Sequence, residues 1–317
     1  MAFTYRVKLA GFNNPLWAKE LPSKLYRDLV KSLYNNDDTL FLQHLEYIIE
    51  HICPGILEEG LNIIDKIALL LYMRSICISP DLELKANCSN SKKSFERKVK
   101  LEEMISKIES VKYHSSVTHN NIVVNHSVIK AKDEVYFLNI TQDLEFTYLL
   151  ASSIDNVIIN DKILLFNKLS FEERLKVVEN LPLILSKKIY ESIIAIETEI
   201  TKTKLLTISS PYVKDTIIVD LPVSASPKVS LEFCKLLFND DLNNLYKMTF
   251  NLVNKGNFSA EYVDGITPAE QLLYWSYFIQ QAQKEQEAYD KASKGKDAPS
   301  FGGPNLNSNK ESPSEFT

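Results

Sequence analysis

One continuous apolar stretch, Leu61–Ile78, dominates the hydrophobic pattern of this chain. Its first half spaces apolar residues at i, i+3 and i+4, and from Ile67 onward it is apolar on nearly every side. A helix of that kind is covered on most sides. Asp65, Lys66 and Arg74 interrupt the stretch, and such charges are costly in lipid. The pattern therefore predicts a buried core helix and not a membrane span.

The charged residues of this helix are expected to find partners elsewhere. Asp65 and Arg74 lie on opposite faces of a helix, because nine positions correspond to two and a half turns. They are therefore not expected to pair with each other. Arg74 should meet a carboxylate from another segment or extend its guanidinium to water.

The segment before the central helix predicts one strand and two helices. Phe3–Leu9 alternates as a strand does. Ser23 is a good N-cap for an amphipathic helix, and a second helix is expected over about Thr39–Ile52. Cys53, Pro54 and Gly55 then stop that second helix.

Several segments in which apolar and polar residues alternate follow the central helix. They predict a small antiparallel sheet over about residues 80–141. The expected strands are Leu82–Asn87, Phe95–Leu101, Val111–Tyr113, Asn121–Val124, Val128–Ile129 and Val135–Ile140. The next run, residues 156–166, is rich in β-branched residues, but its pattern does not decide between helix and strand.

The second half again predicts helices around a hairpin. Helices are expected from Leu144, from Ser170 as N-cap, from Pro182, and over 231–238 and 241–253, with a hairpin at about 203–222. Thr267–Glu270 has the form of a capping box with proline in the first turn, and it precedes the aromatic run LLYWSYFI.

These elements predict an α+β fold, mainly helical, with two small antiparallel β-hairpin or sheet insertions and a disordered C-terminal tail. We expect an N-terminal helical unit over 1–143 with a β insertion at about 80–141, and a C-terminal helical unit over 144–281. Residues 282–317 are polar and rich in Ser, Pro, Gly, Asn and Lys, so they cannot bury enough apolar surface to fold alone.

Composition narrows the classes of function. The 317 residues carry a net charge of −5, which offers no basic field for nucleic acid. The eight glycines form no phosphate-binding loop, and no secretory signal precedes the first strand. Four cysteines are too few for a disulfide framework in a chain of this length, so we expect assembly in a reducing cytoplasm.

No motif indicates catalysis, a cofactor or a metal. Signatures of nucleophilic and metallopeptidase sites are missing, so we expect no enzyme. Cys88 stands at a hairpin tip, but Ser91 occupies the place of the second thiolate of a zinc ribbon. His114, His119 and His126 are close in sequence, yet no shared face is fixed, and we expect them on the surface of a hairpin.

The aromatic run is the one candidate binding surface. Tyr274 and Phe278 share a helix face, and Trp275 neighbours Phe278. Together with Tyr277 they either dock a terminal helix on the rest of the protein or form a partner-binding surface, since aromatic residues are common interface anchors.

The order of these motifs resembles the baseplate hub protein family of T4-like tailed bacteriophages. The resemblance rests on LPSKLYRDL, a second helix ending at Cys53, the central LLLYMRS, and a strand ending in a cysteine at a hairpin tip. The resemblance continues through LSFEERLKVVENLP, a second hairpin and FNDDLNNLYKM. In total it covers about residues 1–279. In relatives the hairpin tip is often Cys-x-x-Cys, of which this chain keeps only Cys88.

The resemblance implies a structural or assembly protein of the contractile-tail baseplate hub, located in the virion. Its partners would be other baseplate hub or tail proteins, with self-association left open, and it would need neither nucleic acid nor a membrane span. The alternative is a tail-assembly chaperone or host-directed scaffold protein that is not retained in the virion. The family offers no catalytic residues to transfer.

Overall fold

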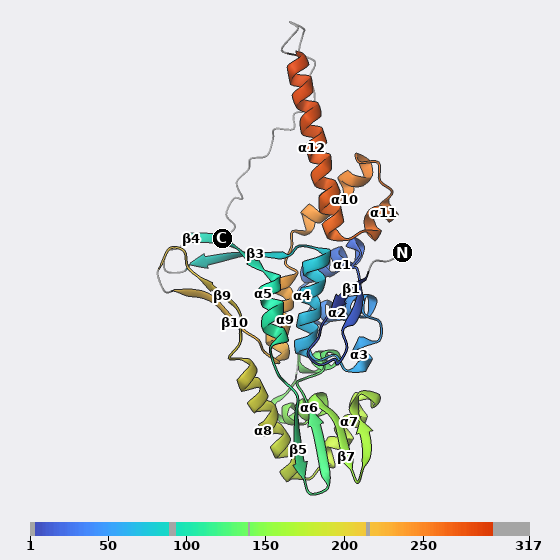
Figure 1. Cartoon of the computed structure of the whole chain (residues 1–317), viewed down its shortest axis with the longest axis vertical. Coiled ribbons are helices and arrows are strands. Elements are labelled where there is room, and N and C mark those ends of the chain that lie inside the picture. Colours follow the sequence, from blue (N-terminus) through green and yellow to red (C-terminus); the bar gives the residue numbers. More distant parts are fainter. Residues whose placement is uncertain (1–3, 89–92, 139, 214–215, 294–317) are drawn as a thin grey trace. The chain divides into compact units, whose positions relative to one another are not determined.

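The central apolar segment forms helix α4 (Ile63–Cys77), and other helices surround it (Figure 1). The computed structural model describes residues 4–88, 93–138, 140–213 and 216–293, except the side chains at 142, 143, 292 and 293. The chain divides into two compact units, Met1–Leu272 and Leu273–Thr317. The boundary expected near residue 143 stays a prediction.

The architecture is mainly helical with small antiparallel sheets, as predicted. The helical elements of the first unit besides α4 are α1 (Ser23–Leu33), α2 (Asp38–Ile52), α3 (Ile56–Glu59), α5 (Leu101–Glu109), η1 (Ala131–Phe137), α6 (Gln142–Ser153), η2 (Phe166–Lys168), α7 (Phe171–Glu179), α8 (Leu183–Ile200), α9 (Pro227–Leu237), α10 (Leu242–Asn254) and α11 (Ala260–Gly265). Helix α12 (Pro268–Ser293) begins in the first unit and continues into the second. The disordered tail was expected over 282–317; its first part, 282–293, is instead the end of α12, and 294–317 lie outside the described residues.

Within the described residues, the strands form four separate antiparallel sheets. Three are two-stranded: β1 (Thr4–Val7) with β2 (Leu16–Lys19), β3 (Asp81–Cys88) with β4 (Lys93–Lys100), and β9 (Lys204–Ser209) with β10 (Ile217–Pro222). The fourth has the order β5 (Ser115–His119), β6 (Ile122–His126), β7 (Ile154–Ile159) and β8 (Lys162–Leu165). The β-branched run at 156–166 thus contributes to two neighbouring strands.

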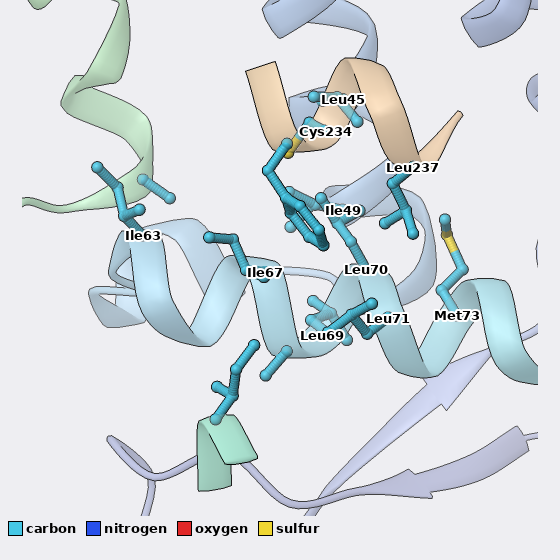
Figure 2. Close-up of a cluster of buried hydrophobic side chains, with 14 of the residues drawn as sticks. Leu45, Ile49, Ile63, Ile67, Leu69, Leu70, Leu71, Met73, Cys234 and Leu237 are labelled. Carbon is cyan, nitrogen blue, oxygen red and sulfur yellow. The ribbon is translucent and has the colours of Figure 1, made fainter. Parts of the chain in front are cut away.

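Helix α4 is buried nearly all round, as its pattern predicts. Its apolar side chains from Ile63 to Met73 are at most 3% exposed, apart from Tyr72. Figure 2 shows Leu45 of α2 and Cys234 and Leu237 of α9 gathered around the same stretch of this helix. Each fully buried leucine or isoleucine contributes about 1.5–3 kcal/mol through the hydrophobic effect. This helix therefore organises the main core.

A second, smaller core lies between the four-stranded sheet and helices α6, α7 and α8. Val124 of β6 and Val157 of β7 are cross-strand partners and are buried on the helix-covered face. Leu150 of α6 and Leu185 and Ile189 of α8 complete this core. The segment from β5 to α8 consequently packs on itself through local contacts.

The predicted sheet at 80–141 is interrupted. Helix α5 separates β4 from β5, and the strands divide between two sheets, one of which is completed by β7 and β8. The strands predicted at Val111–Tyr113 and Val128–Ile129 are wrong, because neither segment belongs to a strand. The strand predicted at Val135–Ile140 is wrong as well, because 135–137 belong to η1. Its neighbours Asp133 and Glu134 explain this: each forms a buried ion pair, with Arg174 and Lys66 respectively, and the short helix presents both acids to the interior.

The helix starts confirm most of the predicted caps. Ser170 and Glu173 form a reciprocal capping box at α7, and Asp241 caps α10. Thr267 and Glu270 exchange the expected bonds, with 2.8 Å from the Thr267 amide to the Glu270 carboxylate. The prediction that Ser23 is the N-cap of α1 is wrong. Ser23 is the first residue of α1, and its hydroxyl caps nothing. Its amide donates to the Ile266 carbonyl at 2.8 Å.

Candidate functional site

Asp65 lies buried near the start of α4 and receives hydrogen bonds from three segments. The Tyr113 hydroxyl donates at 2.6 Å, the Asn62 amide at 3.0 Å and the Gly11 backbone amide at 3.2 Å. Burial raises the pKa of the Asp65 carboxyl, although the Tyr113 and Gly11 donors oppose that rise. A side chain on Gly11 would collide with this carboxylate at 2.4 Å. Asp65 therefore fastens the loop after β1 to the core.

A polar hollow of about 470 Å³ opens beside Asp65. Its polar lining includes Lys130, whose ammonium pairs with Asp155, and His114, whose Nδ1 is 3.7 Å from the same carboxylate. Burial alone would raise the pKa of Asp155, but His114 and Lys130 outweigh it and lower the pKa. The Lys130–Asp155 pair therefore holds β7 to the segment before η1.

Arg74 meets a distant carboxylate, as predicted. Its guanidinium donates to both oxygens of Asp240, at 2.8 and 3.2 Å. The Tyr26 hydroxyl also donates to Asp240, and Arg27 on the same helix pairs with Asp264. Helices α1 and α4 are thereby joined to the segment around α10 and α11. Asp65 and Arg74 do not contact each other in any recorded hydrogen bond or ion pair of the described residues.

The described residues of the β3–β4 and β9–β10 hairpins do not include a zinc donor set. The Ser210 hydroxyl donates to the Cys88 sulfur at 3.2 Å, so a serine faces the single thiol. Serine is a poor zinc ligand, and Ser91 lies outside the described residues. Tyr212 continues the contact, because its hydroxyl donates to the Ser94 carbonyl at 3.2 Å and its ring packs edge-on against Phe95. The described residues that flank the two tips therefore pack the hairpins against each other.

The three histidines do not converge. His114 is half exposed beside Asp155, and His119 ends β5. The expectation of surface histidines is wrong for His126, which is 0% exposed at the end of β6, and burial lowers the pKa of its imidazole. Within the described ranges, no three His, Cys, Asp or Glu side chains are arranged to hold a metal ion.

The predicted aromatic surface lies on the part of α12 that belongs to the second unit. The rings of Trp275 and Phe278 stack, with centroids 5.5 Å apart and planes 15° from parallel. Tyr277 is 57% exposed, whereas Tyr274, Trp275 and Phe278 are half-buried. One helical turn therefore carries a stacked pair together with an exposed tyrosine.

Sequence reasoning missed a second apolar surface, on strand β8. All four residues of this strand are exposed, and three of them are apolar: Ile163, Leu164 and Leu165. The sequence signalled the hairpin, though not the exposure of its edge: in the turn between β7 and β8, Asn160 and Asp161 both adopt positive φ angles, as a two-residue hairpin requires. An Asn-Asp pair between two β-branched runs could have identified the hairpin.

The comparisons with known proteins bear on the first two thirds of the chain. A family model described as the T4 bacteriophage base plate protein matches residues 4–205, which is more than half of the 317 residues. Neither a curated protein nor a solved structure gives a match. The matched span includes helices α1 to α8 and the complete four-stranded sheet, whereas α9, which packs on α4, lies beyond it. The chain therefore belongs to the T4 bacteriophage base plate protein family.

Proposed function

We propose that this protein is a structural component of the baseplate hub and that it acts by binding other hub or tail proteins through the Tyr274–Phe278 segment. The observation that carries the proposal is the family match over residues 4–205. Members of this family are baseplate proteins of T4-like phages, which implies a structural role in the viral tail. To the family match, the proposal adds a place within the hub and partners among the hub or tail proteins.

The aromatic segment has the character of an interface anchor. Tyrosine and tryptophan are enriched among the residues that dominate binding energy, because each offers a large rigid surface with a polar end. Tyr277 exposes more than half of its surface, and Trp275 and Phe278 form a preordered stack beside it. Binding to this turn would therefore cost little side-chain entropy.

The charged groups of the first unit support a non-enzymatic role. Lys66 with Glu134 and Arg174 with Asp133 are ion pairs whose side chains are at most 3% exposed. Burial alone would lower the pKa of the Lys66 ammonium, but Glu134 outweighs it and raises the pKa. Groups held in this way fasten segments together, because their charges are already committed to each other.

Complementation of a phage that lacks this gene tests the proposal. The double variant Trp275→Ala/Tyr277→Ala should lower the titre of infectious particles at least about tenfold, since each anchor typically contributes more than 1 kcal/mol to binding. Tyr289→Ala is the matched control, because Tyr289 is 67% exposed on the same helix but lies outside the aromatic run. It should restore the wild-type titre.

Mass spectrometry of purified particles distinguishes a hub component that stays in the virion from an assembly chaperone that does not. Recovery of the wild-type protein in the tail, together with tails that fail to form with the double variant, supports a hub component. Full complementation by the double variant would contradict the assigned surface. A protein that is required for tails but missing from purified particles would identify an assembly chaperone instead.

A further inference from the structure

Strand β8 is the open edge of the four-stranded sheet, whose order is β5, β6, β7, β8. An edge strand presents a row of backbone donors and acceptors that can pair with another strand. The opposite edge differs, because α8 packs against β5 (Figure 1). Among the described residues, no backbone hydrogen bond outside the sheet involves Ile163 or Leu165. The β8 edge is therefore available for pairing.

The register identifies which groups of β8 point outward. The loop Asn160–Asp161 joins Ile159 to Lys162, and residues that flank a two-residue hairpin loop form a hydrogen-bonded pair. Hydrogen-bonded and non-hydrogen-bonded pairs alternate along an antiparallel ladder. Leu164 therefore bonds to Val157 of β7, whereas the N–H and C=O groups of Ile163 and Leu165 face the open edge.

The side chains at this edge add an apolar surface. Ile163 is 63% exposed and continues a cross-strand row formed by Val123 and Ile158, both half-buried. This row lies on the face opposite Val124 and Val157, which the helices cover. A strand added beside β8 could extend the row with an apolar residue at every second position.

The available area and the flanking charges favour a foreign strand over a second copy. Complete burial of Ile159, Ile163, Leu164 and Leu165 would remove at most about 400 Å² per copy, whereas stable interfaces bury about 1,200–2,000 Å² in total. Lys162 begins β8 and Lys168 follows it in η2, and neither forms an ion pair among the described residues. In antiparallel pairing of two β8 strands centred on Leu164, Lys162 would face Phe166 of the second copy, two positions from the second copy's Lys168, so like charges would be neighbours.

We propose that the β8 edge binds an extended segment of another baseplate protein by strand addition. The segment carries apolar residues at alternate positions and acidic residues at its ends, where they face Lys162 and Lys168. Backbone pairing with Ile163 and Leu165 supplies the register, and the row through Ile158 selects the apolar side chains. This surface is distinct from the Tyr274–Phe278 segment and does not depend on the hub assignment.

The test uses the full chain and a model strand. The probe is an end-blocked peptide that alternates valine and threonine between two glutamates, with a lysine-ended twin as its control. Amide exchange followed by NMR should show at least about tenfold slower exchange at Ile163 and Leu165 with the glutamate-ended peptide, and no change at Leu164, which is already paired. The glutamate-ended peptide should bind at least about fivefold more tightly, and salt should reduce the difference.

Two variants locate the binding. Leu165 has a φ of −87°, close to the range of proline, so Leu165→Pro removes the outward donor while β7 keeps its pairing. It should bind the peptide at least about tenfold more weakly than Leu165→Ala, which loses the side chain alone. Lys162→Glu/Lys168→Glu alters only exposed side chains and should reverse the preference toward the lysine-ended peptide.

Three results would overturn the proposal. One is unchanged exchange at Ile163 and Leu165 in the presence of saturating glutamate-ended peptide. Another is equal binding of both peptides to the wild-type chain and to Lys162→Glu/Lys168→Glu. The third is a peptide-free dimer in which these two amides are already protected, because the occupant would then be a second copy. None of these results bears on the complementation test of the aromatic segment.

Discussion

Arg74 and Asp240, separated by 166 positions, form a two-point ion pair that joins the central helix to the turn before α10. Burial opposes both charges: it raises the pKa of Asp240 to about 6 and lowers that of Arg74 to about 10. The direct contact and the Tyr26 hydroxyl compensate for this loss of hydration. Removing one partner alone should therefore lower the stability of the fold more than removing both, because it leaves an unpaired charge.

Arg74→Met should lower the free energy of unfolding by about 2–3 kcal/mol, because it leaves the Asp240 carboxylate without its cation. The value is below that for a fully buried pair, since the Asp240 side chain is 34% exposed. Urea denaturation monitored by circular dichroism measures it. Adding Asp240→Leu should recover part of the loss, because the unpaired charge is then also removed.

Lys98→Ala is the matched control for this measurement. Lys98 pairs with Glu83 across β3 and β4, but both side chains are at least 66% exposed. Such a surface pair contributes little to stability, because solvent screens both charges. Equal losses for Arg74→Met and Lys98→Ala would contradict the structural role assigned to the Arg74–Asp240 pair.

The raised pKa of Glu46 on α2 should make the stability of the fold depend on pH. Burial, and then the charge of Glu134, raise the pKa of Glu46 from 4.5 to about 7. The folded state therefore holds this proton at higher pH than the unfolded state does. Its contribution to stability is fully present below pH 4.5 and is lost as the pH rises through 7.

Glu46→Gln removes this titration. The variant should equal the wild type near pH 4.5 and exceed it by about 1 kcal/mol at pH 8, after allowance for solvent screening of a partly exposed group. Thermal melts of both proteins across this range provide the test. A constant difference between them at every pH would show that Glu46 has an ordinary pKa.

Cys88→Ala should have no metal-dependent effect, because the thiol faces the Ser210 hydroxyl and not a set of zinc ligands. Elemental analysis of the purified protein should give less than about 0.1 zinc per chain, well short of the full occupancy of a structural site. The melting temperature of either protein should not respond to a chelator. Stoichiometric zinc that is lost in Cys88→Ala would overturn this reading.

Deletion of residues 293–317 should leave the melting temperature of the folded protein nearly unchanged. The segment is polar and holds few apolar side chains, so it has little to bury. Differential scanning calorimetry of the full and shortened chains makes the comparison. A fall of several degrees would mean that the tail packs on the rest of the protein.

Local patterns predicted local features well. The apolar periodicity of α4 identified a helix covered on most sides, and the Ser170 and Thr267 caps were readable because their partners lie three residues away. The partner of Arg74 was not readable, since only the fold brings Asp240 to it. For the same reason, Val135 entered a short helix: buried pairs to Arg174 and Lys66 override its preference for strand.

The two candidate binding surfaces also differ in how far the sequence alone reveals them. The aromatic run was visible because four large side chains are close together in sequence, although its partner is not encoded there. The open edge of β8 depends on which strand ends the sheet, and that order follows from long-range pairing of β6 with β7. Exposure of Ile163 and Leu165 could therefore be recognised only in three dimensions.

Cryo-electron microscopy of the purified phage tail tests the central claim most directly, because it reports both the location of the chain and the contacts of its surfaces. We predict density for the α4-centred unit within the baseplate hub, with Trp275 and Tyr277 packed against a neighbouring protein. A baseplate resolved at side-chain level that lacks this chain, or that leaves both aromatic side chains in solvent, would contradict the account.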